Sequence, residues 1–138
     1  MPRYRFGGQE LLRAARRFEE GLMDEIADVV YQTARLIEAE AKSRAPVNMG
    51  NLRASIDINK ITDHKYEVVS AANYSVWIEY GTGIYATDGK GRKTKWSYYS
   101  EELQRWVTTN GSKAQPFWFP ALEIGERYFY SELRRLGL

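Results

Sequence analysis

The chain has 138 residues, with 20 Lys and Arg against 18 Asp and Glu, so its formal net charge is only +2. So balanced a charge does not by itself indicate nucleic acid or an acidic membrane as a partner. Cysteine is absent and histidine occurs once, which excludes a disulfide scaffold, a catalytic thiol and a poly-histidine metal site. The length predicts one domain over residues 1–138.

The first predicted element is a long amphipathic helix over residues 9–44. Its apolar residues recur at steps of three and four, from Leu11 through Phe18 and Leu22 onward, which is one stripe of an α-helix. At 1.5 Å per residue the helix would be about 50 Å long, more than the roughly 30 Å width of a small domain, so one end should project. We expect the C-terminal half to pack on the chain's own sheet and the N-terminal half to pack on another subunit. Gly21 is a point where the helix could break, because glycine costs about 1 kcal/mol relative to alanine.

A first antiparallel hairpin is predicted after this helix. Pro46 ends the helix, because the residue before a proline avoids the helical conformation. Residues 48–51 are typical of a turn, and residues 52–59 alternate as a strand. A polar turn at 62–65, which contains the only histidine, leads into a returning strand at 66–71.

The second half of the chain completes the predicted fold. Residues 73–80 fit either a strand or a short helix, and a loop over 81–95 follows. Residues 96–109 alternate like the arms of a second hairpin, so the sheet region as a whole spans 52–109. A final helix is predicted over 120–136, with Arg134 and Arg135 complementing its dipole. The predicted class is α+β: a long N-terminal helix packed on an antiparallel β-sheet, a meander with an extra hairpin, and a C-terminal helix.

The sequence offers little that would support catalysis. His64 lies in a polar hairpin turn, where a solvated side chain is the simplest interpretation. Glu79 precedes a glycine turn and could be a buried acid, but neither a nucleophile nor a second carboxylate can be assigned to it. Neither a nucleophile-elbow motif nor a phosphate-loop motif occurs. We therefore expect neither an enzyme nor a cofactor.

A basic loop precedes the second hairpin. It contains Lys90, Arg92, Lys93 and Lys95, and aromatic residues follow from Trp96. Basic side chains next to aromatic ones can bind single-stranded nucleic acid through phosphate charge and base stacking. Solvated charges beside cross-strand aromatic pairs would give the same pattern, and we favour that interpretation. A nucleic-acid-binding module that uses residues 90–95 remains the alternative function.

Three segments combine aromatic or arginine residues with proline or glycine and are hard to explain as core alone. They are APVNMGNLRASI at 45–56, YSVWIEYGT at 74–82 and QPFWFPALE at 115–123. Aromatic-rich segments of low conformational entropy are favoured at protein interfaces as well as in cores. In this order the three segments resemble the gp-ten-like family of tailed-phage head–tail joining, neck and tail-completion proteins.

The resemblance implies a structural virion protein that forms a ring at the head–tail interface or at the tail end during virion assembly. The implied partners are the chain itself, in a ring of six or twelve copies, phage neck or adaptor proteins, and tail-tube or tail-terminator proteins. DNA would pass through such a ring. The implied location is the neck or tail of the virion, and the host cytoplasm during assembly. A membrane is not expected, because no stretch approaches the roughly 20 apolar residues of a membrane span.

A ring built from one chain needs heterologous contacts, in which one surface meets a different surface of the next subunit. We expect the projecting helix on one side of that contact, and the aromatic hairpin with the proline-flanked aromatic segment on the other. The candidate interface residues are Leu11, Phe18, Leu22, Pro46, Leu52, Arg53, Trp77, Glu79, Tyr80, Trp96, Trp106, Phe117, Trp118 and Phe119. The candidate residues facing the lumen or DNA are Lys90, Arg92, Lys93 and Lys95.

Overall fold

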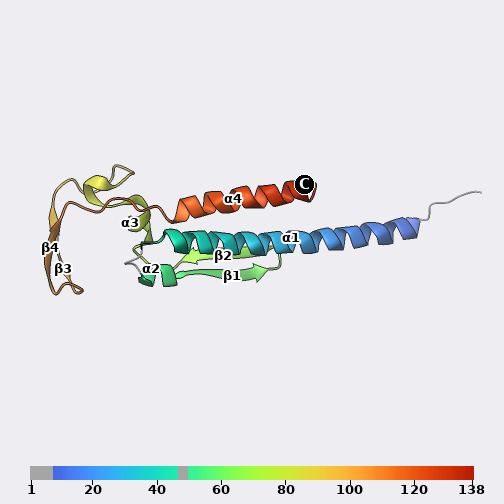
Figure 1. Ribbon diagram of the computed structural model, residues 1–138, viewed down its shortest axis with the longest axis horizontal. Coiled ribbons are helices and arrows are strands. Elements are labelled where there is room, and N and C mark those ends of the chain that lie inside the picture. The colour runs from blue at the N-terminus through green and yellow to red at the C-terminus, as the bar shows by residue number, and fades with distance from the viewer. Residues whose placement is uncertain (1–7, 47–49) are drawn as a thin grey trace, which may run out of the picture.

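The computed structural model describes residues 8–46 and 50–138, with the elements laid out along one long axis (Figure 1). In chain order they are α1 (Gly8–Arg44), α2 (Gly50–Ala54), β1 (Ile56–Thr62), β2 (Lys65–Ser70), α3 (Ser75–Tyr80), the short 3-10 helix η1 (Gly83–Tyr85), β3 (Trp96–Ser100), β4 (Arg105–Thr109) and α4 (Trp118–Arg135). The predicted α+β class, with a long first helix, antiparallel hairpins and a last helix, is confirmed. None of the helices in these two ranges is long and apolar enough to cross a membrane.

Helix α1 is the longest element and packs against α4 and against both strands of the first hairpin. It runs for 37 residues and passes through Gly21 without a break, which makes it about 55 Å long. Its C-terminal half lies between α4 on one side and the β1–β2 hairpin on the other (Figure 1). At the hairpin turn, His64 donates from Nε2 to the carbonyl oxygen of Met23 at 3.0 Å. The N-terminal part extends past both neighbours, as predicted, and every residue from 8 to 21 is exposed.

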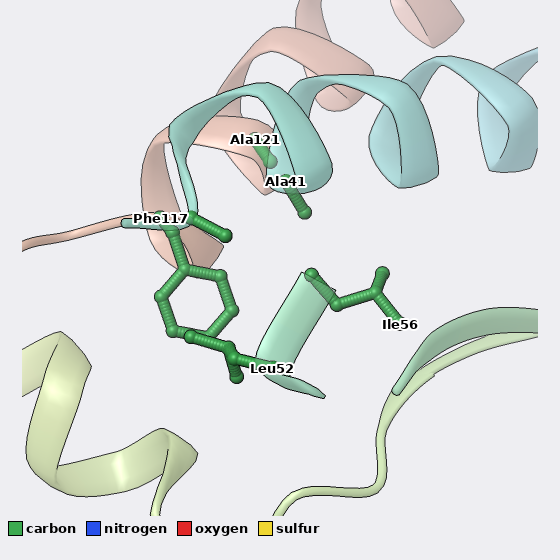
Figure 2. Close-up of a cluster of buried hydrophobic side chains, with 6 residues drawn as sticks. Ala41, Leu52, Ile56, Phe117 and Ala121 are labelled. Carbon is green, nitrogen blue, oxygen red and sulfur yellow. The ribbon is translucent and has the colours of Figure 1, made fainter. Parts of the chain in front are cut away.

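The buried core lies where the C-terminal end of α1 meets α2, the start of β1 and the start of α4 (Figure 2). Phe117, Leu52 and Ile56 are its largest fully buried side chains. The other members are alanines, namely Ala41, Ala45 and Ala121. These small side chains let α1 and α4 approach closely while the larger ones fill the space beside them.

A glycine sets the distance between α1 and α4 farther along the pair. Gly125 of α4 is buried, and a Cβ placed on it would overlap the side chain of Ile37 on α1. The absence of a side chain at Gly125 therefore lets α4 pack directly against Ile37, and any larger residue at this position would push the two helices apart.

Two predicted features differ in the structure. Residues 52–54, predicted as the start of a strand, belong to helix α2, and the strand begins at Ile56. Two apolar positions were too few to establish the alternation of a strand, and Leu52 packs with Ala41 and Phe117 in the core from a short helix instead. The region 52–109 is also not one sheet: among the described residues, β1 pairs with β2 alone and β3 with β4 alone. The ambiguous run at 73–80 forms helix α3 and separates the two hairpins. Residues 48 and 49 of the predicted turn lie outside the described residues.

Candidate assembly surfaces

Glu79 joins α3 to the first turn of α4. Its Oε2 accepts hydrogen bonds from the backbone N–H groups of Phe117 at 2.8 Å and Trp118 at 2.9 Å, and its Oε1 accepts one from Phe119 at 3.2 Å. The first N–H groups of a helix have no partner within the helix, and a carboxylate there also interacts favourably with the helix dipole. Glu79 is 7% exposed. The burial that the sequence suggested for Glu79 is therefore confirmed. Both carboxylate oxygens accept capping hydrogen bonds.

The glycine turn after α3, at residues 81–83, is hydrogen-bonded to the segment that follows β4. The N–H of Thr82 donates to the carbonyl oxygen of Ser112 at 2.9 Å, and the N–H of Ser112 donates to Thr82 Oγ1 at 2.8 Å. Gly83 has a positive φ of 63°, and a Cβ on it would overlap the backbone of Asn110. Only glycine fits this crossing, which positions the β3–β4 hairpin at the end of the molecule opposite to the N-terminal end of α1 (Figure 1).

A largely apolar groove of about 540 Å³ opens at this end of the molecule. We call it the α3 groove. Its lining includes Val76, Trp77, Asp88, Lys90, Arg92 and Trp96. Val76 and Trp77 on α3 are 60% and 61% exposed. On the facing wall the guanidinium of Arg92 lies 5.8 Å from the ring centre of Trp96, within range of a cation–π interaction.

The β3–β4 hairpin carries a second exposed aromatic surface. Trp106 is 71% exposed and packs edge to face against Tyr99, with ring centres 5.9 Å apart. Tyr98 is exposed as well. These cross-strand contacts fit the sequence interpretation of aromatic pairs in a solvated hairpin.

The N-terminal end of α1 carries the third exposed apolar surface. We call Leu11, Phe18 and Leu22 the α1 stripe, because they lie on one face of the helix at spacings of seven and four. Leu11 is 70% exposed and Phe18 is 74% exposed, whereas Leu22 is half-buried. Exposed apolar side chains gathered on one face typically mark a surface that another molecule covers.

The structure separates the candidate interface residues into three groups. Leu11, Phe18, Trp77, Tyr80, Trp106 and Phe119 are exposed, and Leu22, Arg53, Trp96 and Trp118 are half-buried. Pro46, Leu52, Glu79 and Phe117 are buried. These last four serve the interior of the protein, so we remove them from the candidate interface. Sequence reasoning missed Val76 and Leu12, both exposed apolar residues whose only signal was a large side chain next to one already chosen.

The four basic candidate residues share one property in the structure. Lys90, Arg92, Lys93 and Lys95 are all exposed in the loop before β3. The structure brings Lys90 and Arg92 to the rim of the α3 groove. Within the described residues no group of three His, Asp or Glu side chains is placed to hold a metal ion.

Comparison with protein-family models gives one result that bears on these surfaces. Residues 9–81 match the family described as "Bacteriophage HK97-gp10, putative tail-component". Comparisons with curated proteins and with solved structures find no match. The matched region covers more than half of the chain, from α1 to the end of α3, and includes the first of the three segments that carried the resemblance and nearly all of the second. The chain therefore belongs to the HK97-gp10-like family of phage tail components.

Proposed function

We propose that this tail component forms a ring at the head–tail interface or at the tail end, and acts there in tail completion or head–tail joining. The observation that carries the proposal is the placement of exposed apolar side chains at both ends of an elongated molecule (Figure 1). The two ends are chemically different, so copies would associate head to tail. Such contacts give a closed ring when the rotation between neighbours closes.

The aromatic hairpin supplies a surface for other phage proteins. Trp106, Tyr98 and Tyr99 are exposed on β3 and β4, and aromatic side chains are enriched at the centres of protein interfaces. We propose that neck or adaptor proteins and the tail-tube or tail-terminator proteins contact the ring through this hairpin. The HK97-gp10-like family is a family of structural tail components, which supports a role without catalysis, in the virion.

Self-association provides the first test. The purified protein should sediment as a larger species at high concentration, or once tail-tube protein is added. A monomer at every concentration, with and without tail-tube protein, would contradict the ring. Electron microscopy of particles produced without this protein tests the role in the virion, because unjoined heads and tails should accumulate.

The basic loop favours one additional element of function. Lys90, Arg92, Lys93 and Lys95 are exposed together, and Arg92 lies over an aromatic ring. We propose that this loop faces the lumen, where DNA passes. The alternative to a ring subunit is a nucleic-acid-binding module. The two proposals differ in whether the unassembled protein binds DNA. Tight DNA binding by the monomer, with a steep salt dependence, would favour the module.

A further inference from the structure

The α1 stripe is the uncovered continuation of an intramolecular contact. The same helix face carries Val29, which is buried and lies beside Tyr128 and Glu132 of α4. Toward the N-terminus α1 extends past α4 and the hairpin (Figure 1). By helical spacing the apolar face continues there through Phe18 to Leu11, and both side chains are exposed. The exposed part, residues 8–21, is about 20 Å long. A helix end of this length gains nothing from exposing two large apolar side chains to water, so the stripe is suited to a partner.

The α3 groove cannot be filled by the α1 stripe of its own chain. The groove lies beside α3, at the end of the molecule where α1 finishes, whereas the stripe lies at the beginning of α1 (Figure 1). One unbroken helix of 37 residues holds the two apart. Any α1 stripe that occupies the groove must therefore come from a second copy of the chain.

The charges around the two surfaces are complementary. Lys90 and Arg92 line the α3 groove together with one acid, Asp88, so the charged lining of the groove has a net positive charge. On α1, helical periodicity places Glu10 and Glu19 along the two flanks of the stripe. Arg17 is the one base on a flank, and its Nε is turned back to the carbonyl oxygen of Arg13 at 3.4 Å.

We propose that the α1 stripe of one copy binds in the α3 groove of the next copy. Phe18 and Leu11 contact Val76 and Trp77, while Glu19 faces Arg92 in the groove lining. Lys93 and Lys95 of the same loop do not line the groove, so they are the residues that would face the lumen. The contact uses different surfaces on the two partners, so each bound copy presents a free stripe and a free groove for further growth. This inference rests on the proposed ring and specifies which residues form its repeated contact.

The absence of cysteine from the chain allows a direct cross-linking test. Two single-cysteine variants are prepared, Phe18→Cys and Val76→Cys, and both positions are exposed enough to leave the fold intact. They are mixed under the conditions in which the protein assembles, with tail-tube protein present if assembly needs it, and treated with a short thiol-reactive cross-linker. The mixture should give a cross-linked pair containing one of each chain, and neither variant alone should give one. Tyr130→Cys, at an exposed site on α4, replaces Val76→Cys as the matched control and should give none.

Substitutions that introduce or reverse a charge test the contact independently, with the protein concentration needed for assembly as the readout. Phe18→Glu should raise the protein concentration needed for assembly about tenfold or more, since a buried aromatic contact is lost, while Tyr130→Glu should leave it unchanged. Glu19→Arg should weaken assembly, and Arg92→Glu in the same chain should restore it.

Each outcome separates this contact from the ring itself. A protein that never assembles contradicts both proposals. Assembly without the cross-link between positions 18 and 76, and with no effect of Phe18→Glu, overturns the stripe-in-groove contact and leaves the ring standing. A cross-link from position 18 only to tail-tube protein overturns it as well, because the stripe then binds a different partner.

Discussion

Removing the carboxylate of Glu79 should strongly destabilise the protein. Glu79→Ala leaves the buried N–H group of Phe117 and the half-buried N–H group of Trp118 without their acceptor. The N–H of Phe119 also loses its bond, but that residue is exposed and water can replace the carboxylate. A buried donor left without a partner costs about 1–3 kcal/mol, which applies in full to Phe117, and the half-buried Trp118 adds a smaller cost, so the total should be about 2–4 kcal/mol. That is a large share of the 5–15 kcal/mol by which domains are typically stable.

Two further variants show whether the loss comes from capping. Glu79→Gln keeps an oxygen that can accept from the N–H groups of Phe117 and Trp118. It removes the negative charge at the N-terminus of α4, so it should lower the free energy of unfolding by about 1–2 kcal/mol. Glu126→Ala removes an exposed carboxylate from the same helix and should lie within about 0.5 kcal/mol of the wild type. Urea unfolding followed by far-UV circular dichroism gives all three free energies of unfolding. If Glu79→Ala unfolds at the same urea concentration as Glu126→Ala, the capping argument is refuted.

Two pairs of substitutions test the packing by the same urea measurement. Gly125→Ala should destabilise by about 1–3 kcal/mol because its Cβ meets Ile37, whereas Gly21→Ala has open space around it and should stabilise by up to about 1 kcal/mol; equal effects would show that α1 and α4 do not approach as closely as described. Leu52→Ala should cost about 2–5 kcal/mol, since the side chain is fully buried. Leu11→Ala should change the stability of the monomer by less than about 0.5 kcal/mol, and a larger loss would mean that the N-terminal end of α1 is covered within the monomer.

The elements set by local pattern were predictable from the sequence. The stripe through Leu11 and Phe18 has an unambiguous helical period over many turns, and α1 follows it from Gly8 to Arg44. The second hairpin was equally clear, because alternation and a polar tip mark β3 and β4. The projection of α1 followed from arithmetic alone, since the predicted helix was longer than a small domain is wide.

The tertiary links could not be predicted, because nothing local encodes them. Glu79 caps a helix that begins at Trp118, 39 residues later in the chain, and the N-cap residue of α4, Phe117, makes no side-chain cap hydrogen bond. The same limit explains the error at Leu52. Its burial was foreseeable for either a strand or a helix, but the choice of a short helix was made by packing against Phe117 and Ala41 (Figure 2). Local propensity is a weak guide where tertiary contacts decide.

The internal links of this protein bear directly on whether a ring can close. A head-to-tail contact closes into a ring only if every copy holds its two contact surfaces at the same separation and angle; otherwise the chain of copies grows open or at random. Here one continuous helix carries the α1 stripe, and the close approach at Gly125 fixes α4 against that helix. Glu79 then fixes α3, and with it the α3 groove, to the first turn of α4. Stripe and groove are thus connected through rigid packing at every step, so Glu79→Ala, which removes the link between α3 and α4, should disturb closure of the proposed ring even under conditions in which the monomer stays folded.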